Sequence, residues 1–533
     1  MSQKNLSFID EVRRRRTFAI ISHPDAGKTT LTEKFLLYGG AIHQAGSVKS
    51  RRSQKHAVSD WMEIEKQRGI SVTSSVLQFE YNNFCINILD TPGHQDFSED
   101  TYRTLMAADS AVMVIDSAKG VEAQTKKLFQ VCKMRGIPIF TFVNKMDRQG
   151  KDPFELMEDL ENVLGIRSCP VNWPIGSGKE FKGVFNRQKD QIELFNDGNH
   201  GQSIAKSVVG KVDDEKFAGL LGSSLHDQLL NDIELLDVAG DEFDLDKISK
   251  GELTPVFFGS ALTNFGVEPF LESFLDITPP PTPRDSNMGL IDTESDNFSG
   301  FIFKIQANMD KSHRDRIAFL RICSGKFEKG MAVNHVQRGK KVKLAQPQQF
   351  VAQDRVIVDS AYPGDIIGIH DPGIFNIGDT LSQKQTKLQY KGIPQFAPEH
   401  FSRISTLNSL KRKQFLKGIT QISEEGAIQV YKRPNIGMEE LIIGVVGVLQ
   451  FEVLEYRLKN EYNVDITIER LPYRFIRWAE TGSFDPHNMS MTMDTVLVED
   501  KDKNPAFLFQ SEWSPTQLVT RNEGLALSET SIY

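Results

Sequence analysis

The segment of residues 20–30 carries side chains that can hold a chain of phosphates. It reads Ile-Ile-Ser-His-Pro-Asp-Ala-Gly-Lys-Thr-Thr, between an apolar run and an amphipathic stretch. The backbone N–H groups that begin a helix can surround phosphates, Lys28 can reach the β- and γ-phosphates, and the Thr29 hydroxyl can bind Mg²⁺. Ser22 stands where the usual pattern has Gly, so a chance Gly-rich turn is the alternative. The candidate phosphate-binding residues are Ser22, His23, Pro24, Asp25, Ala26, Gly27, Lys28 and Thr29.

A second polar group, Asp90-Thr91-Pro92-Gly93-His94, comes directly after the apolar run 84–89. An aspartate at the carboxyl end of a strand can hold Mg²⁺ through water, and the Gly93 N–H can contact a γ-phosphate. His94 can orient a water molecule for in-line attack on that phosphate, which makes it the candidate catalytic residue. A plain turn and an ordinary loop histidine are the alternatives, because Thr-Pro-Gly also suits a turn.

A further oxygen ligand for Mg²⁺ is available at Ser71, in the stretch Arg-Gly-Ile-Ser-Val of residues 68–72. We interpret this stretch as a switch loop that can bring the Ser71 hydroxyl to the metal beside Thr29 and Asp90. Mg²⁺ prefers such hard oxygen ligands. A serine at the edge of a strand is the alternative.

The base is indicated by Asn144-Lys145-Met146-Asp147, which follows the apolar run 137–143. The Asp147 carboxylate can accept from the N1–H and the 2-amino group of guanine together, whereas adenine would leave it unpaired at a cost. Asn144 would brace the site, and the stem of Lys145 can lie over the base. A backbone N–H to the guanine carbonyl is expected from the segment after the run 255–258. Its residues are Ser260, Ala261 and Leu262.

These motifs require elements that bring them to one edge of a sheet. Short apolar runs bounded by turns are typical of buried strands, and the segments between them, such as 122–135 and 153–164, favour helices. Strands are predicted at 18–21, 84–89, 111–115, 137–143 and 255–258. Their alternation with helices predicts an α/β domain with a mostly parallel sheet covered on both faces. Four motifs in this order, each after a strand, indicate a P-loop GTPase domain that binds GTP or GDP with Mg²⁺.

The rest of the chain divides by composition. Residues 169–250 are polar and then acidic, which indicates an insertion. The Thr-Pro-Pro-Pro-Thr-Pro run at 278–283 can continue neither a helix nor a central strand, so it is predicted to separate the first domain from the rest. Short strands between glycine turns over 299–385 predict a small β-barrel. Helical spacing at 446–459 and a strand at 464–468 predict an α+β region, with weak patterning past 480. The predicted domains are 1–283 (GTP-binding, insertion around 169–250), 284–388 (β-barrel) and 389–533 (α+β with a C-terminal tail).

Bulk properties exclude several classes of protein. The net charge of −8 argues against a general binder of bare nucleic acid, although a local basic patch such as residues 411–413 could still contact RNA. A solvated face is the expected setting for small charge clusters. The four cysteines form no Cys-x-x-Cys pair, so buried free thiols are predicted. No segment resembles a signal peptide or a membrane span, so we expect a cytoplasmic monomer with no membrane partner.

The stretch 60–70, Asp-Trp-Met-Glu-Ile-Glu-Lys-Gln-Arg-Gly-Ile, together with residues 90–94, resembles the translational GTPases near elongation factor G. The chain is most similar to the bacterial class II peptide chain release factors in that family, from about residue 10 to about 475. The stretches that carry this similarity are 17–34, 144–148, 173–185, 396–404 and 447–458. Ser71 departs from the threonine that most of the family has. Only about 58 residues follow position 475, too few for the two further domains of elongation factor G.

The resemblance implies a ribosome-dependent GTPase of translation termination that drives class I release factors off the ribosome after peptide release. It places His94 at the position of the family's catalytic histidine, and ribosomal RNA near the GTPase-activating region would be a contact. Another translational GTPase role, such as a shortened elongation-type or ribosome-rescue factor, is one alternative. A nucleotide-gated binding protein with little turnover is the other, and the presence of both Lys28 and His94 weighs against it.

Overall fold

The computed structural model describes most of the 533-residue chain. The stretch 60–70, apart from Glu65, lies outside the described residues, as does part of the predicted insertion. The described residues are 6–42, 65, 71–196, 206–307, 316–345, 347–351, 354–393, 396–434, 441–480, 482–483 and 489–529.

A seven-stranded sheet forms the first part of the molecule, in the order β2-β3-β1-β4-β5-β11-β6. The neighbours of β1 run parallel to it, and only the edge strand β2 is antiparallel to its partner. The predicted mostly parallel sheet is confirmed, and the sequence reading missed both edge strands. The strands are β1 (Arg15–Ser22), β2 (Ser75–Tyr81), β3 (Phe84–Asp90), β4 (Ser110–Asp116), β5 (Ile139–Asn144), β6 (Arg167–Pro170) and β11 (Leu253–Phe258).

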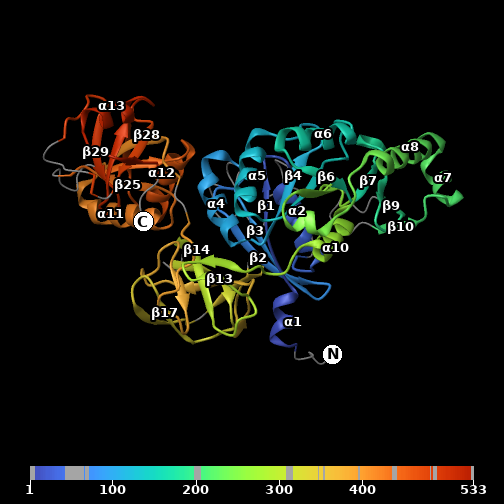
Figure 1. Ribbon diagram of the computed structural model, residues 1–533, viewed down its shortest axis with the longest axis horizontal. Coiled ribbons are helices and arrows are strands. Elements are labelled where there is room, and N and C mark those ends of the chain that lie inside the picture. Colours follow the sequence, from blue (N-terminus) through green and yellow to red (C-terminus); the bar gives the residue numbers. More distant parts are fainter. Residues whose placement is uncertain are drawn as a thin grey trace.

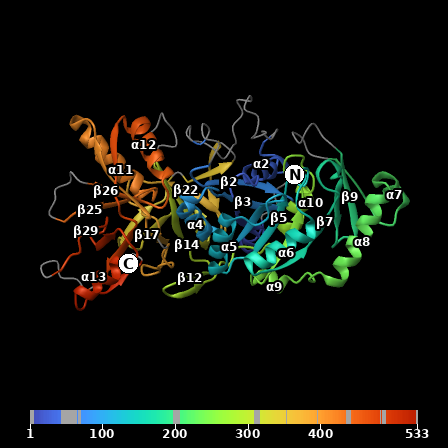
Figure 2. The same ribbon diagram turned by 90° about the horizontal axis from the view of Figure 1, so that it is seen from above.

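Helices cover both faces of this sheet, because successive side chains of each strand point to opposite sides. In β1, Phe18 and Ile20 pack with helices α2 and α10, whereas Ala19 and Ile21 belong to the core that includes α4, α5 and α6 (Figure 2). Both predicted helices are present. The helices are α2 (Lys28–Tyr38), α4 (Ser98–Ala107), α5 (Ala123–Arg135), α6 (Pro153–Leu164) and α10 (Val267–Ile277).

The predicted insertion has its own antiparallel sheet, in the order β10-β9-β8-β7, with helices beside it. It projects at the end of the molecule opposite to the C-terminal part (Figure 1). Its elements are β7 (Asn172–Ile175), β8 (Gly183–Asn186), β9 (Gln191–Asn196), β10 (Lys206–Gly210), α7 (Glu215–Leu221), α8 (Ser223–Ala239) and α9 (Leu245–Ser249).

The second part is all-β, as predicted. An eight-stranded antiparallel sheet, in the order β18-β17-β23-β14-β15-β22-β19-β20, surrounds a separate apolar core. Its strands are β14 (Ser299–Ala307), β15 (Arg316–Ser324), β17 (Ala332–His335), β18 (Lys340–Lys343), β19 (Gln348–Val351), β20 (Asp354–Ile357), β22 (Ile366–His370) and β23 (Thr380–Ser382).

The third part packs helices α11 (Arg412–Glu424) and α12 (Leu449–Tyr462) on a second eight-stranded sheet. The weak patterning past residue 480 was misleading. Strands β29 and β30 lie inside the sheet, and β30 is largely buried, so this segment is part of the fold rather than a tail. The strands are β24 (His400–Thr406), β25 (Gln429–Lys432), β26 (Leu441–Val445), β27 (Ile466–Arg470), β28 (Phe475–Ala479), β29 (Thr495–Glu499), β30 (Pro505–Phe509) and β31 (Leu527–Ser528).

Buried ion pairs join the first two parts. The Asp109 carboxylate accepts from Arg284 at 2.8 Å and from Arg321 at 2.5 Å, and Arg15 donates to Asp365 at 2.8 Å. In the arginine run 13–16, Arg15 and its neighbour Arg16 are buried within β1, so the general expectation that small charge clusters are solvated fails for these two. Their charges are tolerated because Arg15 has a carboxylate across the interface and Arg16 donates to the Leu275 carbonyl of α10 within the first part.

The described residues confirm the prediction for the cysteines. All four cysteines are buried free thiols. Among the helices that the structure describes, none is long and apolar enough to cross a membrane. The domain boundaries at 283 and 388 remain predictions.

Candidate nucleotide-binding site

Four loops that carry the sequence motifs meet at the carboxyl edge of the seven-stranded sheet. They follow β1, β3, β5 and β11, and these strands lie within one run of the sheet order. Ligands of open α/β sheets bind at this edge, next to the strand where the order reverses. Here that strand is β1, which lies between β3 and β4.

The loop after β1 has the backbone conformation of a phosphate cradle. Asp25 has φ 66° and Gly27 has φ 101°, and the second value strongly favours glycine. A Cβ at Gly27 would also lie 2.2 Å from Nδ2 of Asn144. Helix α2 begins at Lys28, and no side chain of the described residues caps it. The first N–H groups of α2 and its positive end are therefore suited to an anion.

Lys28 and Asp90 meet directly beneath this loop. The Lys28 ammonium donates to Oδ1 of Asp90 at 2.5 Å, and both side chains are buried. Lys28 can turn from this partner to phosphate oxygens, which would leave Asp90 available to a cation.

The residues at this loop fit Mg²⁺, because Thr29 at the start of α2 and the Asp90 carboxylate offer hard oxygen ligands. Few protein ligands are needed, since Mg²⁺ in such sites also binds phosphate oxygens. Ser71 is half-buried just before Val72, whose N–H donates to the Glu65 carboxylate at 2.9 Å. The metal-binding roles of Thr29, Ser71 and Asp90 remain predictions.

The loop after β3 lies against the phosphate loop. Thr91 donates to the carbonyl of Ile20 at 2.7 Å, and a Cβ at Gly93 would lie 3.4 Å from Cα of Pro24. His94 follows at the surface, with a side chain that is 30% exposed, and its Nδ1 accepts from the Asp96 N–H at 3.2 Å. In the neutral ring that arrangement places the proton on Nε2.

The loops after β5 and β11 form the candidate base site. Asn144 joins three loops: its Nδ2 donates to the Ala26 carbonyl at 2.8 Å, and its Oδ1 accepts from the N–H groups of Lys145 at 2.8 Å and Ala261 at 2.9 Å. Ala261 therefore directs its N–H to Asn144. Oδ1 of Asp147 accepts from the Ser260 hydroxyl at 2.6 Å. The structure thus brings the two segments together, and Met146 is buried beneath them while Leu262 is exposed.

Asp116 is a site residue that the sequence reading missed. Lys145 donates to Oδ2 of Asp116 and to the Asp25 carbonyl, both at 2.5 Å, so its stem spans the space between the two loops. Burial opposes the charge on Asp116, but the hydrogen bonds from Lys145 and the Ala118 N–H outweigh it and lower the pKa of Asp116. Its position at the carboxyl end of β4 was the available signal.

The other residues of the phosphate loop also have structural partners. His23 lies beside Glu122, with its Nε2 3.3 Å from the carboxylate. Ser22 ends β1 and is buried, which accounts for a small side chain at the position where glycine is usual.

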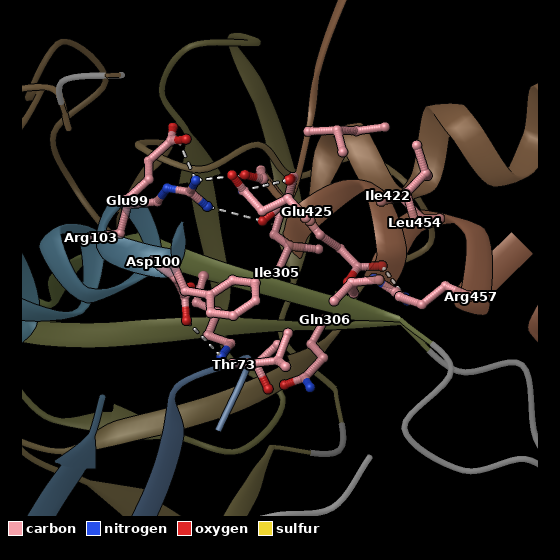
Figure 3. Close-up of a pocket in the computed structure, with 18 residues that line it drawn as sticks. Thr73, Glu99, Asp100, Arg103, Ile305, Gln306, Ile422, Glu425, Leu454 and Arg457 are labelled. Carbon is pink, nitrogen blue, oxygen red and sulfur yellow. Dashed lines mark hydrogen bonds and ion pairs between the residues drawn. The ribbon is translucent and has the colours of Figure 1, made fainter. Parts of the chain in front are cut away.

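A pocket lies where the three parts of the molecule meet (Figure 3). Arg103 of α4 donates to the carbonyls of Glu425 and Gly426 at 3.1 and 2.7 Å, and Lys304 of β14 lies 3.7 Å from Asp100. Burial raises the pKa of Glu425, although Arg457 opposes this effect. Sequence reading missed this junction, because partners such as Arg103 and Glu425 are 322 positions apart.

Three family models match successive stretches of the chain. The Elongation factor Tu GTP binding domain matches residues 13–280, Elongation factor G domain 2 matches residues 297–384, and the Class II release factor RF3, C-terminal domain, matches residues 390–519. The last match extends past residue 480, in agreement with the buried strands there.

Curated relatives match over nearly the full length. Peptide chain release factor 3 of Symbiobacterium thermophilum is 59% identical over 525 residues, covering 98% of this chain and 99% of the relative. The protein of the same name from Trichormus variabilis is 54% identical, covering 97% of this chain and 96% of the relative. A crystal structure of a protein from Thermus thermophilus shares the fold, with a TM-score of 0.69 and 21% identity over 91% of this chain and 72% of that one.

Proposed function

The chain belongs to the peptide chain release factor 3 family of translational GTPases, and we propose on this premise that it drives class I release factors off the ribosome after peptide release. It hydrolyses GTP, acts in translation termination, and interacts with the ribosome as its family does. To these family properties the proposal adds three points: the dissociation of class I release factors, activation of GTP hydrolysis by the ribosome, and action as a cytoplasmic monomer. The observation that supports the nucleotide chemistry is the convergence of the four motif loops on one edge of the sheet, and the match of the C-terminal part to the release factor domain supports the termination role.

The proposed chemistry uses each loop for one task. The N-terminus of α2 and the Lys28 ammonium would bind the β- and γ-phosphates and offset their charge. Thr29, Ser71 and Asp90 would hold Mg²⁺, and the bound ion would neutralise negative charge on the phosphates. The loop residues 22–27 and 90–93 would enclose the phosphates.

His94 would act in the hydrolysis step. Its Nδ1 accepts from the Asp96 N–H, so Nε2 carries the proton in the neutral ring and can engage the attacking water or the transferred phosphate. With 30% of its side chain exposed, the ring can be placed by a large partner. We expect low GTPase activity alone and strong stimulation by ribosomes.

The base would be selected by Asp147. Its carboxylate would accept from two guanine donors while Ser260 fixes one of its oxygens, and residues 144–146 and 260–262 would complete the pocket. GTP binding would order the switch loops, and hydrolysis would release them.

The experiment that tests this proposal measures GTP turnover with purified ribosomes for the wild type and His94→Ala. We expect strong stimulation of the wild type and a loss of roughly 10²–10⁴-fold in the variant, with nucleotide affinity unchanged. A wild type that ribosomes do not stimulate would contradict the activator role. An unaffected variant would remove His94 from catalysis. Release of a labelled class I factor from terminated ribosomes then tests the dissociation step directly, because an elongation-type or rescue factor would not promote it.

A further inference from the structure

The segment just after His94 is attached to the third part of the molecule. The short 3-10 helix η1 (Gln95–Phe97) follows His94 and contacts α12. Within it, Asp96 is only 8% exposed. The Asp96 N–H donates to Nδ1 of His94 at 3.2 Å, and its Oδ1 lies 3.2 Å from the same nitrogen. The hydrogen bond to His94 comes from the Asp96 backbone, so the orientation of the ring depends on how the rest of Asp96 holds that N–H in place.

The other oxygen of Asp96 is held from the third part. Its Oδ2 accepts from the Leu449 N–H at 2.8 Å, at the first residue of the 14-residue helix α12. A carboxylate at this end of a helix is favoured by the helix dipole and satisfies an otherwise unpaired N–H group. One carboxylate therefore lies between the candidate catalytic ring and α12.

The turn before α12 leaves no free space beside Asp96. A Cβ at Gly447 would lie 2.1, 2.3 and 2.4 Å from Cγ, Cβ and Cα of Asp96. The N–H of Gly447 is itself fixed, since it donates to the Gln450 side chain at 3.0 Å. Because a backbone atom of Asp96 is among those contacted, an added methyl could be accommodated only by moving η1 or α12.

Apolar and polar contacts on either side keep η1 docked. Phe97 packs with Val72 and with Val453 of α12 in a small buried cluster. Further along α4, Arg103 donates to the carbonyls of Glu425 and Gly426 (Figure 3). The η1–α4 segment is therefore fastened to the third part at two places, and the first of them touches the residue that orients His94.

We propose that Asp96 is a positioning residue for GTP hydrolysis, and that the turn at Gly447 and Leu449 sets the orientation of His94 through it. This inference rests on the proposed role of His94 and adds the residues that govern it. Docking of the third part on η1 would then be required for efficient hydrolysis but not for nucleotide binding, since Asp96 lies outside the phosphate and base loops.

The test measures ribosome-stimulated turnover, nucleotide affinity and thermal unfolding of the full chain. The variants are Asp96→Ala, Asp96→Asn, Gly447→Ala, His94→Ala and the double variant that combines the last two. Gly392→Ala is the matched control, because a Cβ at this exposed glycine meets nothing within 4 Å. Asparagine can still accept from the Leu449 N–H and keeps its own N–H for His94, so it tests geometry rather than charge.

The expected result is a loss of at least roughly tenfold in kcat for Asp96→Ala and Gly447→Ala. This loss is a part of the roughly 10²–10⁴-fold rate increase that a positioned acid or base contributes. The KM and the affinity for GDP should stay within about twofold, Asp96→Asn should retain most of the activity, and Gly447→Ala should add no further loss in the His94→Ala background.

Two results would overturn the proposal: wild-type turnover in Asp96→Ala, or equal losses from Gly447→Ala with and without His94. The second would mean that the turn acts on folding or docking alone. If His94→Ala itself turns over normally, the proposed function fails first and this inference fails with it. If His94→Ala is inactive while Asp96→Ala matches Gly392→Ala, only the inference fails. A Gly447→Ala variant that does not fold leaves the decision to Asp96→Ala.

Discussion

Replacement of Asp147 by Asn tests the base site most sharply, because the structure shows which carboxylate oxygen of Asp147 already accepts a hydrogen bond. Oδ1 of Asp147 accepts from the Ser260 hydroxyl at 2.6 Å. A carboxylate has about four acceptor positions, so enough remain for the N1–H and the 2-amino group of guanine. In Asp147→Asn the amide oxygen can keep the Ser260 hydrogen bond, and the NH₂ group then faces a guanine donor.

The magnitude follows from the two lost hydrogen bonds. Each bond to a charged acceptor is worth about 1.5–3 kcal/mol, so two cost about 3–6 kcal/mol. At about 1.4 kcal/mol per tenfold, GTP affinity should fall roughly 10²–10⁴-fold. Xanthine has a carbonyl in place of the 2-amino group and can accept from the new amide, so XTP affinity should rise in the same variant.

Competition against a fluorescent guanine nucleotide measures both affinities. Asp359→Asn is the control, because that carboxylate is 90% exposed and lies in the second part of the chain. Ser260→Ala should cause a smaller loss, about 1 kcal/mol, because water can replace the hydroxyl at the half-buried Asp147. Unchanged GTP affinity in Asp147→Asn would remove Asp147 from the base pocket. Equal loss of GTP and XTP would mean that the pocket had collapsed instead.

Two further predictions concern buried groups. Asp109→Ala should lower the free energy of unfolding by about 3–5 kcal/mol, because it leaves two buried guanidinium groups without their carboxylate. Urea unfolding measures this change, and a midpoint equal to that of Asp359→Ala would refute it. Burial raises the pKa of the Cys85 and Cys132 thiols to about 12, so the reactive thiolate is scarce at about pH 8. A thiol reagent should therefore show no fast phase of cysteine labelling with the folded chain at that pH. After denaturation it should react with all four cysteines. Rapid labelling of the native protein would contradict the buried positions.

The sequence alone determined the nucleotide-binding edge, because its signals are local. Each motif is a short run of residues that follows an apolar strand, and parallel strands bring their carboxyl ends to the same edge of a sheet. The helices predicted at 122–135 and 153–164 were also readable as segments between the strands, and in the structure Gly136 and Gly165 end them in left-handed conformations. The roles of the individual site residues remain predictions.

Only the tertiary structure decided the contacts between the parts. The general expectation that small charge clusters are solvated fails at Arg15, because its burial depends on the Asp365 carboxylate of the second part. Strand β30 is weakly patterned because both of its faces are covered, which removes the alternation that marks a half-buried strand. The link from Leu449 to Asp96 spans 353 positions of sequence. No local pattern encodes such a pair, since its free energy depends on the packing of elements that the chain brings together only on folding.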